Sequence, residues 1–152
     1  THLPAIRSAD LQLIWQTGKT ESEKWKQRAE GHSNIWVDAF ITEMEFAYAA
    51  ADIVVSRAGA IAVAELCVVQ KPVLFVPFPF AAEDHQTANA KALVEKDAAL
   101  MVKDSEAKEK MVDMLISLAK DASQQEQLKR NIAKYAVLDA DRQVADEILK
   151  SL

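Results

Sequence analysis

Five short apolar runs recur along the chain, and polar, helix-prone segments separate them. We expect strands within Leu11–Lys19, Asn34–Ile41, Asp52–Ser56, Lys71–Phe78 and Ala98–Asp104, the first of them closing on a glycine turn. The segments between them predict helices over Thr20–Glu30, Thr42–Ala51, Ala60–Val69 and Asp84–Asp97. From Ser105 to Leu152 the pattern is helical, with breaks near Asp121 and Asp139.

Several of the predicted strands are apolar at every position rather than at alternate positions. Ile53–Val55 and Val73–Val76 are continuous runs of this kind. Strands buried on both faces have this pattern, and they are typical of parallel sheets covered by helices. We therefore expect a single α/β domain over residues 1–152, with a doubly wound, mostly parallel sheet and with residues 139–152 as a C-terminal helix.

Composition and charge argue against several classes of protein. The net charge of −5 does not favour nonspecific binding to nucleic acid, which needs clustered Lys and Arg. Cys67 is the only cysteine, so no internal disulfide can form, and a reduced, cytoplasmic setting fits best. The longest apolar run, Pro72–Ala82, is too short and too rich in proline to cross a bilayer. We find no spacing typical of metal ligands, a nucleophile elbow or a P-loop, and we predict no metal, cofactor or catalytic residue in this chain.

Two loops are candidates for ligand binding, because open α/β sheets bind ligands beyond the carboxyl ends of their strands. Ser56–Gly59 leads into the helix that begins at Ala60, and Pro77–Gln86 leads into the helix that begins near Asp84. Free N–H groups at the start of a helix favour an anion such as phosphate. Gly59 would let the backbone approach a ligand, although a tight strand-to-helix turn would explain this glycine equally well.

Glu65 is the one acid in an otherwise apolar helix. It lies four residues after Ile61, and therefore on the same helix face. If that face borders the crevice, the carboxylate accepts hydrogen bonds from two vicinal hydroxyls, as acids do for ribose in dinucleotide-binding folds. A surface acid in an ion pair is the alternative.

The second loop places polar residues at the start of its helix. Asp84 would cap that helix, and His85 and Gln86 would lie in its first turn, where they either contact a polar ligand or are simply exposed. Together, the two loops predict a crevice for a phosphorylated, hydroxyl-rich small molecule.

Two segments carry a resemblance to a known family. SRAGAIAVAEL, at Ser56–Leu66, and QKPVLFVPFPFAAEDHQTANA, at Gln70–Ala90, resemble the C-terminal half of the MurG family, and the resemblance extends from Leu11 to about Leu138. It implies the Rossmann-like donor half of a GT-B glycosyltransferase. This family transfers N-acetylglucosamine from UDP-GlcNAc to undecaprenyl-pyrophosphoryl-MurNAc-pentapeptide (lipid I), giving lipid II for peptidoglycan. The implied location is cytoplasmic, peripheral on the inner face of the bacterial cytoplasmic membrane, with membrane contact only through the full-length protein.

The resemblance also implies which residues contact UDP-GlcNAc. These are Ile41 for the uracil edge, Ser56 and Arg57 for the floor of the loop, Gly59, Ala60 and Ile61 for the diphosphate and sugar, Glu65 for the ribose, and His85 and Gln86 for the GlcNAc hydroxyls. Two positions depart from the family pattern. Many relatives carry Thr at the position of Ala62, which puts one hydroxyl contact to phosphate in question, and Gln is common at the position of His85.

Parts of the family pattern are missing from this sequence. The N-terminal acceptor domain, with the proposed catalytic base and the membrane-facing patch, is absent, as are the first strand of the donor domain and its glycine-rich GGS.GA loop. That strand is central in a sheet of order 3-2-1-4-5-6. Without it, the strands in Leu11–Lys19 and Asp52–Ser56 would face a gap of about 9–10 Å. We expect that these two strands pair directly, that another chain fills the gap, or that upstream residues fill it.

Two further functions stay open. The chain could be a stand-alone nucleotide-sugar binding or interaction module, or the donor half of another UDP-sugar glycolipid transferase. A reading frame that continues upstream into a second α/β domain would argue against the first. Competition between UDP-GlcNAc and UDP-glucose would test the second.

Overall fold

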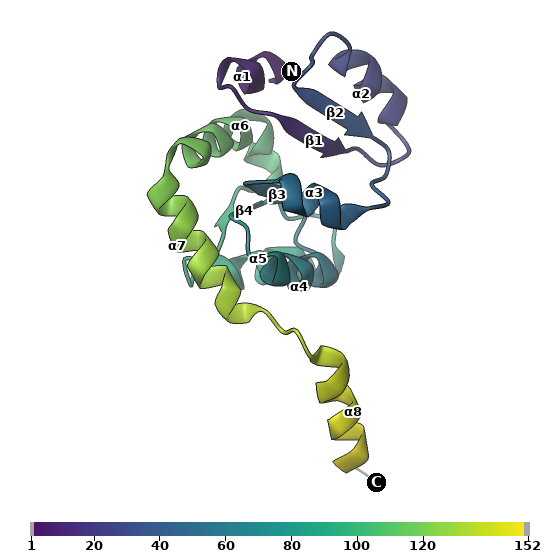
Figure 1. Ribbon diagram of the computed structural model, residues 1–152, viewed down its shortest axis with the longest axis vertical. Helices are drawn as coiled ribbons and strands as arrows, with labels where there is room; N and C mark the ends of the chain where they lie inside the picture. The colour runs from purple at the N-terminus through teal and green to yellow at the C-terminus, as the bar shows by residue number, and fades with distance from the viewer. Residues whose placement is uncertain (1, 151–152) are drawn as a thin grey trace.

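The computed structural model describes residues 2–150, in which strands and helices alternate (Figure 1). The strands are β1 (Leu13–Gln16), β2 (Ile35–Asp38), β3 (Val54–Ser56), β4 (Val73–Phe75) and β5 (Leu100–Met101). The helices are α1 (Leu3–Ser8), α2 (Ser22–Ala29), α3 (Met44–Ala50), α4 (Ala60–Val69), α5 (His85–Val94), α6 (Asp104–Lys120), α7 (Ala122–Ile132) and α8 (Ala140–Lys150), with 3-10 turns at Ala82–Asp84 and Ala133–Tyr135.

Every strand and helix that the sequence pattern predicts is present, including the break at Asp121. The Asp121 side chain accepts a hydrogen bond from the backbone N–H of Gln124 at 2.9 Å and so caps α7. Helix α1 was not predicted, and it buries Leu3 and Ile6. Residue 1 of the predicted domain and residues 151–152 of the predicted C-terminal helix lie outside the described residues.

The strands form two parallel sheets. β1 pairs with β2, and the second sheet has the order β3-β4-β5. Read in sequence, these orders agree with a 3-2-1-4-5-6 sheet from which the first strand is missing. The expectation that β1 pairs directly with β3 is wrong, because the two strands belong to separate sheets. The other two ways of filling the gap stay predictions.

Strands β1 and β3 each have some backbone groups that do not pair within their own sheet. The backbone N–H groups of Leu13 and Thr17 donate to β2 and its flanking residues at 2.9 Å. Alternate residues of a parallel strand direct their backbone groups to the same neighbour. The backbone groups of Ile14 therefore point away from β2. In the same way Val54 donates to the Pro72 carbonyl at 2.9 Å, and Val55 faces away from β4. Val55 is 39% exposed, whereas its run predicted burial on both faces. The reason is that β3 is an edge strand with a neighbour on one side only.

The core is centred on β4, whose residues Val73, Leu74 and Phe75 are fully buried, as the apolar run predicted. Val73 and Phe75 pack with residues of α4 and α5, among them Leu66, Cys67, Ala90 and Leu93. Leu74 packs on the opposite face, with Val76, Val102 and residues of α6. Burial raises the pKa of the Cys67 thiol, which therefore stays protonated at neutral pH. This core fixes the β3–α4 and β4–α5 loops relative to one another.

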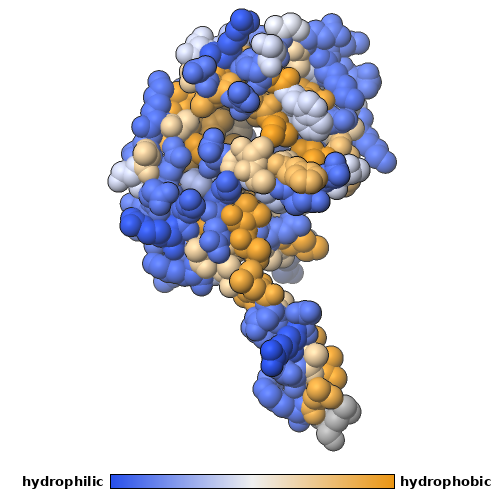
Figure 2. Space-filling view, in the orientation of Figure 1, coloured by the Kyte–Doolittle hydropathy of each residue, from blue (hydrophilic) through white to orange (hydrophobic). Residues whose placement is uncertain are grey.

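The C-terminal helix α8 projects away from the rest of the domain (Figure 1). Apolar side chains gather along one side of it (Figure 2), and Val144 and Leu149 are 61% and 68% exposed. Within residues 2–150, no helix combines the length and the apolar composition that a membrane span requires.

Candidate functional site

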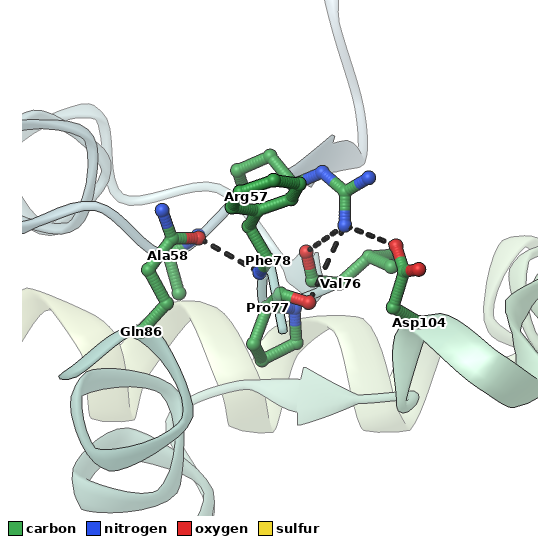
Figure 3. Close-up of polar contacts among 7 residues, drawn as sticks. All are labelled: Arg57, Ala58, Val76, Pro77, Phe78, Gln86 and Asp104. Carbon is green, nitrogen blue, oxygen red and sulfur yellow. Dashed lines mark hydrogen bonds and ion pairs between the residues drawn. The ribbon is translucent and has the colours of Figure 1, made fainter. Parts of the chain in front are cut away.

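The loops that follow β3 and β4 are joined by two side chains from the first turns of α5, one of which, Gln86, is drawn in Figure 3. The Gln86 side-chain oxygen accepts hydrogen bonds from the backbone N–H of Ala58 at 3.1 Å and of Phe78 at 3.0 Å. The Asn89 side-chain nitrogen donates to the Ala58 carbonyl at 3.1 Å. Ala58 is fully buried, so both of its backbone groups depend on these two side chains.

Arg57 makes a second connection between the loops (Figure 3). One guanidinium nitrogen donates to the carbonyls of Val76 at 3.1 Å and Pro77 at 3.3 Å, and it also forms an ion pair with Asp104 at the start of α6. The guanidinium lies over the Phe78 ring, 5.5 Å from its centroid. The Arg57 side chain is therefore bonded to the β4–α5 loop and to the start of α6.

The start of α4 leaves backbone donors open. Gly59 has φ −63° and ψ 149°, and a Cβ added there would meet nothing within 4 Å, so the turn itself does not require glycine. The first N–H of the helix with a partner inside it is that of Val63, which donates to the Gly59 carbonyl at 2.9 Å. The N–H groups of Ala60, Ile61 and Ala62 precede it, and no side chain caps this helix in the described structure. These open N–H groups make the start of α4 suitable for binding an anion.

Glu65 is exposed on the same side of α4 as Ile61, which is 81% exposed, while Leu66 and Cys67 face the core. The Tyr48 hydroxyl donates a hydrogen bond to Glu65 Oε2 at 3.3 Å. Among residues 2–150, no Lys or Arg forms an ion pair with Glu65. The ion-pair alternative for this acid therefore has no support within those residues.

Within residues 2–150, no hydrogen bond or ion pair joins Ile41 or His85 to Glu65 or to the start of α4. The Ile41 N–H donates to the Gln16 side-chain oxygen at 2.8 Å, and the residue lines a cavity of about 430 Å³ together with Trp36, Phe40 and Phe46. His85 begins α5 and is exposed. The predicted cap at Asp84 is wrong, because Asp84 has a left-handed backbone (φ 54°) and its side chain makes no capping bond to α5.

Comparison with known protein families identifies the family of this chain. Residues 2–144 match the model of the glycosyltransferase family 28 C-terminal domain. The chain belongs to this family. The MurG resemblance that the sequence carried is thereby confirmed, as is the α/β fold with parallel sheets.

The relatives of this domain that we compare carry the name of one enzyme. The UDP-N-acetylglucosamine–N-acetylmuramyl-(pentapeptide) pyrophosphoryl-undecaprenol N-acetylglucosamine transferase of Bacteroides thetaiotaomicron is 48% identical over 144 residues, 93% of this chain and 39% of the relative. The enzyme of the same name from Flavobacterium psychrophilum is 44% identical over 145 residues, 95% of this chain and 39% of the relative. The chain thus spans about two fifths of the length of these relatives.

Solved structures agree with this assignment. The crystal structure of Acinetobacter baumannii MurG superposes with a TM-score of 0.82 at 30% identity, over 97% of this chain and 46% of that chain. The glycotransferase of kitacinnamycin superposes with a TM-score of 0.68 at 19% identity, over 99% of this chain and 38% of that chain, which is evidence for the fold alone.

Several residues in and around this candidate site were not predicted from the sequence. Asp104 begins α6, three residues after the last residue of β5, so its place near the carboxyl edge of the sheet was a usable signal for a partner of Arg57. Tyr48 and Gln16 gave no comparable signal, because their contacts with Glu65 and Ile41 join separate elements.

The double hydrogen bond to Gln86 predicts a loss of stability on truncation. Gln86→Ala leaves the buried N–H of Ala58 without its acceptor, which should lower the free energy of unfolding by about 1–3 kcal/mol. Gln86→Glu keeps an acceptor oxygen and should lose less. Urea unfolding monitored by tryptophan fluorescence measures both variants, and His85→Ala, in the same turn but exposed, is the control. Equal midpoints for Gln86→Ala and the control would mean that Gln86 does not hold the loops together.

Proposed function

We propose that this domain is the donor-binding half of an inverting glycosyltransferase that transfers N-acetylglucosamine from UDP-GlcNAc to lipid I, giving lipid II. The observation that carries the proposal is the exposed Glu65 carboxylate, one helical turn beyond the open N–H groups of Ala60 and Ile61. A nucleoside diphosphate has a matching pair of groups, an anionic diphosphate and a ribose diol. The names of the relatives support the choice of UDP-GlcNAc.

In this proposal the backbone at the start of α4 binds the diphosphate, with Gly59 giving the ligand room to approach. Glu65 accepts hydrogen bonds from the ribose hydroxyls. Ser56 and Arg57 support the loop from below, because the Ser56 hydroxyl donates to the Arg57 carbonyl at 2.9 Å and Arg57 is bonded to the neighbouring loop.

The sugar and the base would be contacted from two other places. His85 and the amide nitrogen of Gln86 are proposed to donate to the GlcNAc hydroxyls, while the Gln86 oxygen stays with the loops. Ile41 is proposed to read the uracil edge through its backbone. Its N–H is bonded to Gln16 in the free domain, so that side chain would have to turn away for the N–H to reach the base.

The acceptor and the membrane are proposed to contact the remainder of the transferase. The chain spans 39% of the relatives named above, so contacts to lipid I and to the inner face of the cytoplasmic membrane are assigned to the other part of the full-length protein. Removal of a proton from the acceptor hydroxyl is assigned to the same part, because a general base must lie within hydrogen-bonding distance of that hydroxyl.

The test of this function is transfer activity. We expect the full-length protein to convert UDP-GlcNAc and a lipid I analogue into the lipid II analogue, and the purified 152-residue domain to form none under the same conditions. Chromatography of the labelled lipid product measures both. Transfer by the 152-residue domain alone would contradict the assignment of acceptor binding and proton removal to the other part of the full-length protein. Transfer of glucose from UDP-glucose in preference to N-acetylglucosamine would point to another glycolipid synthase.

A further inference from the structure

Tyr48 joins helix α3 to the exposed carboxylate of helix α4. Its ring packs against the core cluster that contains Leu66, Cys67 and Phe75, and its hydroxyl reaches out of that cluster to Glu65 Oε2 at 3.3 Å. Across residues 2–150, this is the one side-chain hydrogen bond or ion pair that reaches Glu65. A residue held by the core thus touches a residue that projects into solvent.

The direction of this hydrogen bond is fixed by chemistry. An ionised carboxylate only accepts, so the phenol must donate. Burial, followed by the charge and hydrogen bond of Glu65, raises the pKa of the Tyr48 hydroxyl, which therefore keeps its proton throughout the neutral range. One lone pair of Oε2 is used by Tyr48, and the rest of Oε2 and the whole of Oε1 remain available to other donors.

We propose that Tyr48 is a positioning residue that orients the Glu65 carboxylate to accept both hydroxyls of a ribose diol. The proposal rests on the donor-binding function proposed above. A free glutamate on a helix surface samples several rotamers and loses that freedom when a ligand binds. The hydrogen bond from Tyr48, whose ring is already held by the core, restricts Glu65 before the ligand arrives, and preorganisation of this kind raises affinity.

The variant that isolates this role is Tyr48→Phe, because it keeps the ring in the core and removes only the hydroxyl. Calorimetry on the full-length protein compares two ligands, UDP and 2′,3′-dideoxy-UDP, which lacks both hydroxyls. We expect the affinity for UDP to fall about two- to tenfold, as the loss of one hydrogen bond implies, and the affinity for the dideoxy ligand to stay the same. Tyr135→Phe is the matched control, because Tyr135 lies in the 3-10 turn after α7 and is expected to change neither affinity.

Each other outcome has a definite meaning. Equal weakening of both ligands would show that the Tyr48 hydroxyl supports packing rather than the diol, and unchanged affinity for both would show that it does nothing for binding. Either result overturns the proposal.

A Glu65→Ala variant distinguishes a failure of this proposal from a failure of the donor-binding function on which it rests. If Glu65→Ala no longer distinguishes UDP from the dideoxy ligand while Tyr48→Phe behaves like the parent, only the role of Tyr48 fails. If Glu65→Ala still distinguishes them, the ribose contact itself fails, and the role of Tyr48 fails with it. In the double variant Tyr48→Phe should cause no further loss, because the two residues act through one contact.

Discussion

Replacing Glu65 with alanine is expected to remove most of the affinity for uridine nucleotides while leaving the domain folded. The side chain is exposed, so its removal creates no cavity and should change stability little. Its loss deprives two ribose hydroxyls of a charged acceptor. A hydrogen bond to a charged group contributes about 1.5–3 kcal/mol at most, which corresponds to roughly ten- to hundredfold in affinity for each hydroxyl.

Calorimetric titration of the full-length protein with UDP measures this effect, and circular dichroism checks the fold. Glu95→Ala is the matched control, because Glu95 is an exposed acid at the far end of α5 from Gln86. Unchanged UDP affinity in Glu65→Ala would exclude the ribose role and would leave the exposed acid on α4 without a function.

Supplying a strand between β1 and β3 is expected to stabilise the domain by several kcal/mol, the largest effect that the structure predicts. Ile14 and Val55 each have backbone groups that point away from their own sheet, and within residues 2–150 these groups have no ladder partner. An inserted parallel strand would satisfy both edges at once. Each backbone hydrogen bond adds about 1 kcal/mol, and apolar burial against the half-exposed Ile14 and Val55 adds to it.

The experiment places a strand in front of Thr1. The residues that precede the matched region in the Bacteroides thetaiotaomicron relative would be fused to the chain, and urea unfolding would be compared with and without them. A fusion of the same length with proline at the centre of the added strand is the control, because proline cannot donate to a ladder. If the fusion and the proline control unfold at the same urea concentration as the unfused chain, no strand fits between β1 and β3.

The regular elements were predictable because the chain marks them locally. Gly18 has φ +75° and ends the turn after β1 as expected, and the fully apolar run at β4 is buried on both faces. Helix α1 was missed because it is a single short segment with two buried residues, even though Pro4 at its start is a helix signal. Separation into two sheets could not be predicted from local patterns, because strand pairing depends on segments far apart in the sequence, but the strand order within each sheet follows the predicted topology.

The candidate site was predictable in position but not in detail. Strand ends and helix starts indicated where Glu65 and Gln86 would lie. The bonds that Gln86 makes to two separate loops are a property of packing, since the same amide on another fold could equally be free to bind a sugar. Tyr48 carried no such signal, and the direction of its hydroxyl becomes known only when α3 and α4 are placed side by side.

The ion pair between Arg57 and Asp104 has a consequence for how the domain would attract a charged ligand. The positive charge of Arg57, at the entrance to α4, is balanced by the Asp104 carboxylate. A diphosphate at this helix would then be held by neutral peptide dipoles at short range rather than by a side-chain cation. Dissolved salt screens full charges over distances of about 8–10 Å but hardly weakens short, directional hydrogen bonds. The contacts at this helix should therefore depend only weakly on ionic strength, and Arg57 would not steer the ligand electrostatically from a distance.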